Sequence, residues 1–241
     1  MYIKSCERAW RAVKNKDPIM VPQADSIKKD LEHTLSETKE FSLSSNLCKR
    51  LRDILYAIAY SRPDMGYVPI MNSYAGVLVL NCKNVNVFNI LSYFLTIPII
   101  SYYINMDRDM LKGYGDILER LIHKYLLETH EHLKNQGYQF LSYVHDAMAS
   151  LYVRSFPYEV VVKVWDRVIG LSEGGLFQVA LSVFKALKEE IFGRNAEDIS
   201  ILVKSPLSYI DEESIFKAME KLQSVPKDFN MLKLEYITSY I

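Results

Sequence analysis

The sequence is poor in the residues that cross-link a chain or interrupt its regular structure. Its 241 residues include three cysteines, nine glycines and eight prolines. The cysteines, Cys6, Cys48 and Cys82, lie far apart without a CxxC spacing, which argues against a zinc site or a disulfide framework and fits a reducing compartment. An all-β fold needs many turns, so the shortage of glycine and proline favours long helices. We therefore predict an all-α protein.

The sequence also has no excess of charge of either sign. Twenty-nine lysines and arginines balance 29 aspartates and glutamates, and no basic stripe carries interleaved aromatic residues, so we expect no nucleic-acid partner. Residues 1–17 have no apolar segment of the kind found in secretory signals. With 49% hydrophobic and 24% charged residues, the composition is typical of a folded soluble protein.

Two long segments carry no charge at all. These are residues 65–82 and 84–106, separated only by Lys83. Their length is compatible with a membrane hairpin. Both contain prolines and several asparagines, whose polar groups are costly in hydrocarbon. We favour buried helices of an all-α core without direct membrane insertion, and keep the hairpin as an alternative.

The first of these segments belongs to the stretch Ile54–Leu80, which predicts two buried helices joined by a short loop. Arg62 precedes Pro63, and a proline disfavours the helical conformation of the residue before it. Asp64 and Gly66 then suit a turn. A polar loop between two rigid helices is a good position for a surface site.

Other helices follow from apolar periodicity and capping residues. We expect helices that begin at Ser5, at Asp25 or Ser26, at Glu173 and at Asp211, with Pro226 after the last of them, and one continuous helix over 107–135. Val160–Val162 fits either a strand or a helix.

Residue spacing does not predict a metal or cofactor site. His123 and His130 would share a face of the helix over 107–135 but lie about 10 Å apart at 1.5 Å per residue. No HExxH pattern is present, and P-loop, GxGxxG, GxSxG and protein-kinase patterns are missing too. We therefore expect no metal and no cofactor.

Four stretches, taken in order and spacing, resemble the TBC domain of Rab GTPase-activating proteins. They are IKKDLEHT (27–34), MGYVPIMN (65–72), VVKVWDRVI (161–169) and EGGLFQVALSVFKALKEEIF (173–192). The family hallmarks are IxxDxxR followed by threonine, GYCQGMN, and a tryptophan–aspartate pair before an apolar helix. ERAWRAV near the N-terminus and HLKNQG before SFPYEVVVKVWD also match, so the resemblance covers roughly residues 5–225.

The resemblance implies a single all-α, two-lobed, multi-helix domain over residues 1–241. Its N-terminal lobe would cover about residues 1–115 and its C-terminal lobe about residues 116–241. The implied partner is a membrane-bound Rab-type small GTPase, which would place the chain in the cytoplasm and peripheral to membranes. Family members supply an arginine and a glutamine in trans, and such a finger accelerates hydrolysis by about 10³–10⁵.

Both catalytic positions depart from the family pattern. His33 stands at the arginine position and Pro69 at the glutamine position. Proline has neither a side-chain amide nor a backbone N–H, and histidine is only partly cationic at pH 7 and lacks the planar guanidinium fork. No catalytic residue is therefore retained. The predicted GTPase-binding residues are Ile27, Asp30, His33, Thr34, Tyr67, Pro69, Asn72, Trp165 and Asp166.

These observations favour a pseudo-GAP, a protein that binds a Rab-type GTPase and regulates vesicle trafficking without two-residue catalysis. Two alternatives remain. One is an active GTPase activator that uses another arginine, such as Arg50 or Arg62. The other is a scaffold that binds a partner other than a GTPase.

Overall fold

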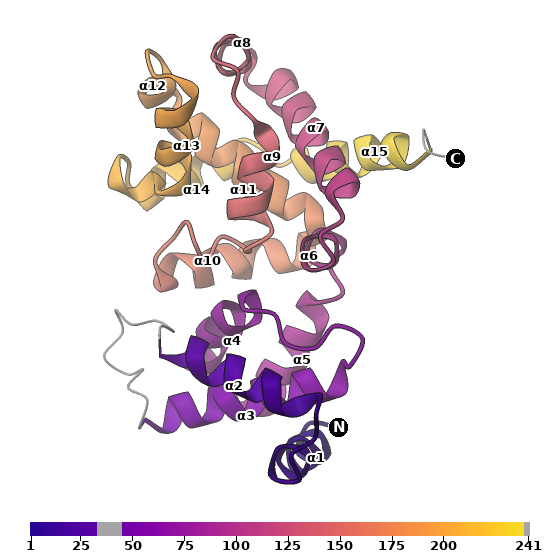
Figure 1. Ribbon diagram of the computed structural model, residues 1–241. Coiled ribbons are helices and arrows are strands. Elements are labelled where there is room, and N and C mark those ends of the chain that lie inside the picture. Colours follow the sequence, from indigo (N-terminus) through magenta and orange to yellow (C-terminus); the bar gives the residue numbers. More distant parts are fainter. Residues whose placement is uncertain (33–44, 239–241) are drawn as a thin grey trace. The chain divides into compact units, whose positions relative to one another are not determined.

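The computed structural model describes residues 1–32 and 45–238, and within these ranges the chain forms helices, turns and loops but no strand. The all-α prediction is confirmed. The helices group into two compact units, residues 1–96 and 97–241, which we describe separately (Figure 1). The predicted lobe boundary near residue 115 falls inside the continuous helix α7, Arg108–Tyr125.

Unit 1, drawn in indigo and purple in Figure 1, is organised around helix α3. Helix α3 contacts each of the other four helices of the unit. Its buried face runs from Cys48 to Ala59, and the hydroxyl of Ser45 accepts the Cys48 N–H at its N-terminus. The unit comprises α1 (Tyr2–Lys14), α2 (Met20–Leu31), α3 (Asn46–Ser61), α4 (Ile70–Asn81) and α5 (Asn84–Phe94).

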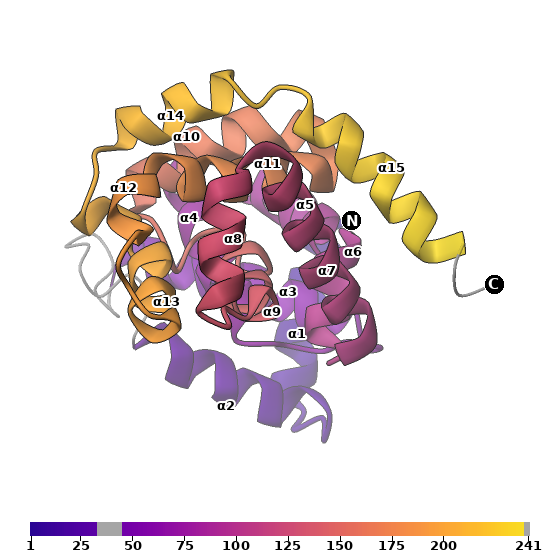
Figure 2. The same ribbon diagram turned by 90° about the horizontal axis from the view of Figure 1, so that it is seen from above.

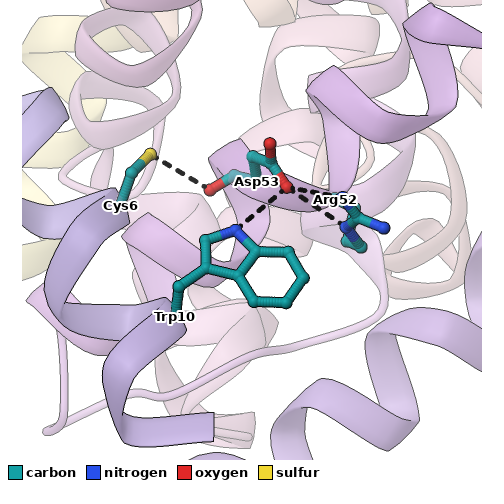
Figure 3. Close-up of polar contacts among 4 residues, drawn as sticks. All are labelled: Cys6, Trp10, Arg52 and Asp53. Carbon is teal, nitrogen blue, oxygen red and sulfur yellow. Dashed lines mark hydrogen bonds and ion pairs between the residues drawn. The ribbon is translucent and has the colours of Figure 1, made fainter. Parts of the chain in front are cut away.

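Asp53 links α3 to α1 (Figure 3). Its carboxylate accepts the indole N–H of Trp10 at 3.3 Å and pairs with Arg52, and its backbone carbonyl accepts the Cys6 thiol. The guanidinium of Arg52 also lies 4.8 Å from the centre of the Trp10 ring. Aromatic, ionic and thiol contacts thus hold α1 against α3.

Unit 2 is organised around helix α11 (Ser172–Ala186), which is buried almost along its whole length. Helices α14 and α15 pack on it, and α15 then extends outward to the C-terminus (Figures 1 and 2). Besides α11, the unit comprises α6 (Pro98–Ile104), α7 (Arg108–Tyr125), α8 (Leu127–Asn135), α9 (Phe140–Tyr143), the π-helical turn η1 (Val144–Met148), α10 (Tyr158–Val168), the short 3₁₀ turns η2 (Ile169–Leu171) and η3 (Pro206–Ser208), α12 (Lys188–Ile191), α13 (Ala196–Lys204), α14 (Glu212–Glu220) and α15 (Val225–Thr238).

Glu173, in the first turn of α11, joins four helices. Its carboxylate accepts the backbone N–H of Ile99 at 2.9 Å and the hydroxyl of Tyr114 at 2.6 Å, and it pairs with Lys233 of α15. Glu173 is only 4% exposed, and a buried carboxylate is tolerated because its oxygens are hydrogen-bonded and paired with a cation.

Three predictions about individual elements need correction or completion. The helix predicted over 107–135 breaks at Leu126, where φ is −138° and ψ is 56°, so α7 and α8 are separate. Val160–Val162 is helical within α10. Pro226 does not end the helical part of the chain, because it lies in the first turn of α15, where a missing N–H costs no hydrogen bond.

The charge-free segments form several helices. Helix α4 is almost entirely buried and packs on α3 and α5. In the described ranges no single helix is long and apolar enough to cross a bilayer; the segments 84–94 and 98–104 reach that length and composition only when taken together across a break.

Candidate functional site

The end of α2 is tied to the start of α4 through Asp30. The hydroxyl of Tyr67 donates to Asp30 Oδ2 at 2.7 Å, and the side-chain amide of Asn72 donates to the Asp30 carbonyl at 3.2 Å. Ile27, one turn before Asp30, is fully buried and anchors α2 on the core of unit 1. The structure therefore brings together three predicted site residues that are far apart in the sequence, Asp30, Tyr67 and Asn72.

Burial and the Asp30 carboxylate both raise the pKa of Tyr67 far above its ordinary value, burial being the larger cause. The phenol is therefore neutral at physiological pH and remains a hydrogen-bond donor. This contact gives the aspartate of the IxxD motif and the tyrosine of the GY motif a shared structural role.

The loop between α3 and α4 has a fixed backbone. The Arg62 carbonyl accepts the N–H groups of Met65 at 3.1 Å and Gly66 at 2.7 Å. Gly66 has φ of +66°, a conformation that glycine adopts without the strain a β-carbon would add. The Tyr67 N–H donates to the side-chain oxygen of Gln23 at 2.9 Å. Sequence reasoning missed Gln23, which lies outside every motif and has no periodicity or spacing that distinguishes it.

Pro69 follows this loop and immediately precedes α4. It is exposed, with φ of −51° and ψ of −33°, and its carbonyl accepts the Asn72 N–H at 3.1 Å. The position thus presents a pyrrolidine ring at the surface, and this ring offers no hydrogen-bond donor. His33 and Thr34, the other predicted residues of this region, lie outside the described residues.

The two remaining predicted residues belong to unit 2. Trp165 is 4% exposed, and its indole N–H donates to the Leu151 carbonyl at 2.9 Å. Its neighbour Asp166 is exposed on the other face of α10. Trp165 therefore stabilises the core of unit 2, whereas Asp166 is accessible to a partner.

The two arginines considered as alternative fingers have different surroundings. Arg50 donates to Asn84 Oδ1 at 2.7 Å and to the Cys82 carbonyl at 2.9 Å, so it links α3 to the start of α5. Arg62 forms a two-point contact with Asp64 on the loop that precedes Pro69. The Arg62 guanidinium lowers the pKa of the Asp64 carboxyl, and both side chains are solvent-accessible.

The histidines of unit 2 are closer than predicted. Because the helix breaks at Leu126, the rings of His123 and His130 lie 4.9 Å apart, and His130 Nε2 lies 3.3 Å from Glu119 Oε1. They line a pocket of about 500 Å³ between α7, α8 and α15. Within residues 1–32 and 45–238, no group of three or more His, Cys, Asp or Glu side chains is arranged to hold a metal ion.

Comparison with known proteins identifies the family. A family model described as the Rab-GTPase-TBC domain matches residues 5–192, most of the chain. The chain belongs to this family. The TBC resemblance inferred from the sequence motifs is confirmed.

Curated relatives are longer than this chain. Drainin of Dictyostelium discoideum is 25% identical over 203 residues, which cover 84% of this chain and 46% of Drainin. TBC1 domain family member 14 of Homo sapiens is 28% identical over 163 residues, which cover 68% of this chain and 24% of that protein. The chain therefore spans less than half the length of these relatives.

Solved structures confirm the TBC fold. The Chlamydomonas flagellar RabGAP TBC domain has a TM-score of 0.69 at 19% identity, with 93% of this chain and 71% of that chain covered. The Ypt/Rab-GAP domain of Gyp1p has a TM-score of 0.67 at 15% identity, with 97% of this chain and 81% of that chain covered. At such identities the likeness concerns the fold.

Proposed function

We propose that this TBC domain binds a Rab-type small GTPase and regulates vesicle trafficking as a pseudo-GAP, without accelerating GTP hydrolysis by the two-residue mechanism. The observation that carries the proposal is the exposed Pro69 at the position where the family motif has its glutamine. Proline cannot orient an attacking water through an amide. The partner class is supported by the family, and the similar solved structures are those of a RabGAP and a Ypt/Rab-GAP domain.

The framework around Pro69 supports retained binding. Asp30, Tyr67 and Asn72 form the contacts that fix α2 against the start of α4. These contacts hold the loop against α2 while Pro69 remains exposed, which is the arrangement expected of a binding loop on a rigid scaffold. In this function the domain sequesters the GTPase or blocks other partners from its switch regions, and stays in the cytoplasm, peripheral to membranes through the GTPase.

The test combines binding with single-turnover hydrolysis. Purified Rab GTPases loaded with a non-hydrolysable GTP analogue or with GDP are titrated with the protein, and hydrolysis of bound GTP is followed in parallel. We expect nucleotide-dependent binding by at least one Rab and hydrolysis at the intrinsic rate. Binding to no member of the panel in either nucleotide state favours the scaffold alternative.

An active GTPase activator is the second candidate, and the surroundings of Arg62 favour it over Arg50 as the source of a cation. Arg62 pairs with Asp64 at the surface, where an ion pair contributes little and exchanges readily. Arg50 instead makes two hydrogen bonds, to Cys82 and Asn84, that join α3 to the start of α5. Acceleration of 10³-fold or more that disappears in Arg62→Ala would establish this candidate and overturn the pseudo-GAP proposal.

A further inference from the structure

Gln23 lies on the second turn of α2, two turns before Asp30 and outside the family motifs. Its side-chain oxygen accepts the Tyr67 N–H at 2.9 Å, and its amide nitrogen donates to the Ile19 carbonyl at 3.1 Å. Because both ends of the amide are engaged, its orientation is fixed. The contact with Tyr67 joins residues 44 positions apart in the chain.

The same amide packs closely on the turn. A β-carbon placed on Gly66 would lie 3.1 Å from Gln23 Oε1, so the peptide between Gly66 and Tyr67 lies directly against this side chain. The N–H groups of Met65 and Gly66 are satisfied by Arg62, and that of Tyr67 by Gln23. Gln23 therefore supplies the acceptor for the last N–H of the turn, where the chain turns toward Pro69.

Tyr67 is thus held by α2 at two points. Gln23 fixes its backbone and Asp30 fixes its hydroxyl, and these two α2 residues are about 10 Å apart along the helix axis. A residue held at both its backbone and the tip of its side chain cannot rotate without breaking one contact. The position of the Tyr67 backbone sets the path of Val68 and Pro69, which lead into α4.

We propose that Gln23 is a positioning residue for the GTPase-binding loop: it fixes the backbone of Gly66 and Tyr67 so that Pro69 is presented to the partner in one conformation. This inference rests on the proposed function. It makes Gln23, which lies outside the recognised motifs, a determinant of affinity for the GTPase. Gln23 acts through the loop and takes no part in chemistry. Preorganisation of this kind raises affinity because less conformational entropy is lost on binding.

Two substitutions distinguish the effect of the acceptor oxygen from the effect of side-chain packing. Gln23→Met keeps a side chain of similar length but has no strong acceptor. Gln23→Glu keeps the size and the acceptor, loses the donor to Ile19 and adds a negative charge. Gln136→Met, at an exposed position after α8, is the matched control. Amide hydrogen exchange at Tyr67, measured by NMR, reports on the loop, and titration with the Rab loaded with a GTP analogue reports on affinity.

We expect Gln23→Met to speed exchange at Tyr67 and to weaken binding, each by about tenfold. Gln23→Glu should restore both to within about twofold of the wild type, and Gln136→Met should change neither. Circular dichroism shows whether each variant is folded; if Gln23→Met unfolds the chain, Gln23→Leu, which also has no acceptor and keeps most of the side-chain volume, takes its place.

Three results would overturn the positioning role: unchanged exchange at Tyr67 in Gln23→Met, faster exchange with unchanged affinity, or a loss in Gln23→Glu equal to that in Gln23→Met. The last result would mean that the amide donor to Ile19, which both variants lack, matters more than the acceptor. Failure of the proposed function is distinct, because then the wild-type chain binds no Rab while the exchange measurement still reports whether Gln23 holds the loop.

Discussion

At the scale of single residues, most of the motif side chains make contacts within the fold. Asp30 and Tyr67 contact each other at 2.7 Å, and Trp165 donates to a buried carbonyl. Their side chains are mostly enclosed, whereas Pro69 and Asp166 are exposed. A motif can therefore identify a family while the residues that contact a partner are a smaller, accessible subset of it.

Tyr67→Phe tests how much the hydrogen bond between Tyr67 and Asp30 contributes to the stability of the fold. The change removes the hydroxyl that donates to Asp30 Oδ2, and a hydrogen bond to a charged group contributes about 1.5–3 kcal/mol in favourable cases. Because this contact is only partly buried, we expect the free energy of unfolding to fall by about 1–2 kcal/mol. Urea denaturation measures it, with Tyr60→Phe as the control because Tyr60 is exposed on α3. Equal stability of the two variants would contradict the role assigned to this contact.

The sequence identified Asp30, Tyr67 and Asn72 as site residues because their spacing matches a family motif. Gln23 could not be found in this way, since its importance comes from a contact with a residue 44 positions away. No local pattern encodes such a pairing. The same reason explains why Glu173 was predicted only as the start of a helix, although its carboxylate joins α6, α7 and α15.

At the scale of elements, local signals predicted the helices well and their ends less well. The loop between Ser61 and Ile70 was predicted correctly, because proline and glycine mark it in the sequence. Two errors concern helix boundaries. Leu126 breaks a helix although leucine favours helices, and Pro226 lies in the first turn of a helix although proline in a helix interior would break it. Pro226 suits the first turn of a helix, so the sequence alone allows it either to follow one helix or to begin another, whereas no local signal marks the break at Leu126.

Gly174 shows how closely two elements approach. A β-carbon on Gly174 would lie 2.7 Å from the Cα of Pro226, so α15 begins directly against α11. Gly174→Ala should therefore lower stability by about 1–3 kcal/mol, despite the better helix propensity of alanine. Gly170→Ala is the matched control, because nothing lies within 4 Å of its β-carbon. Thermal unfolding of both variants measures the effect, and a Gly174→Ala protein as stable as the control would show that α15 can shift without cost.

At the scale of the whole molecule, the family supplies a helical framework whose surface loops carry the chemistry. The framework of this chain is that of a TBC domain, with TM-scores of 0.69 and 0.67 to solved members. Pro69 immediately precedes α4 and lies outside the helix, and His33 follows α2 in the sequence. We therefore expect the catalytic groups to be replaceable without redesign of the fold.

The double change His33→Arg with Pro69→Gln tests this expectation. Position 69 is exposed and its φ of −51° and ψ of −33° suit any L-residue, so glutamine fits without strain. Arginine is always charged and presents a planar fork to phosphate oxygens, which an imidazole does not. A full arginine finger contributes about 10³–10⁵ in rate, so we expect single-turnover GTP hydrolysis by the bound Rab to rise by at least about 10²-fold. Each single change should give much less, because the two groups act together in one transition state. If the double variant binds the Rab as tightly as the wild type while hydrolysis stays at the intrinsic rate, the assignment of these two positions as the lost fingers is wrong.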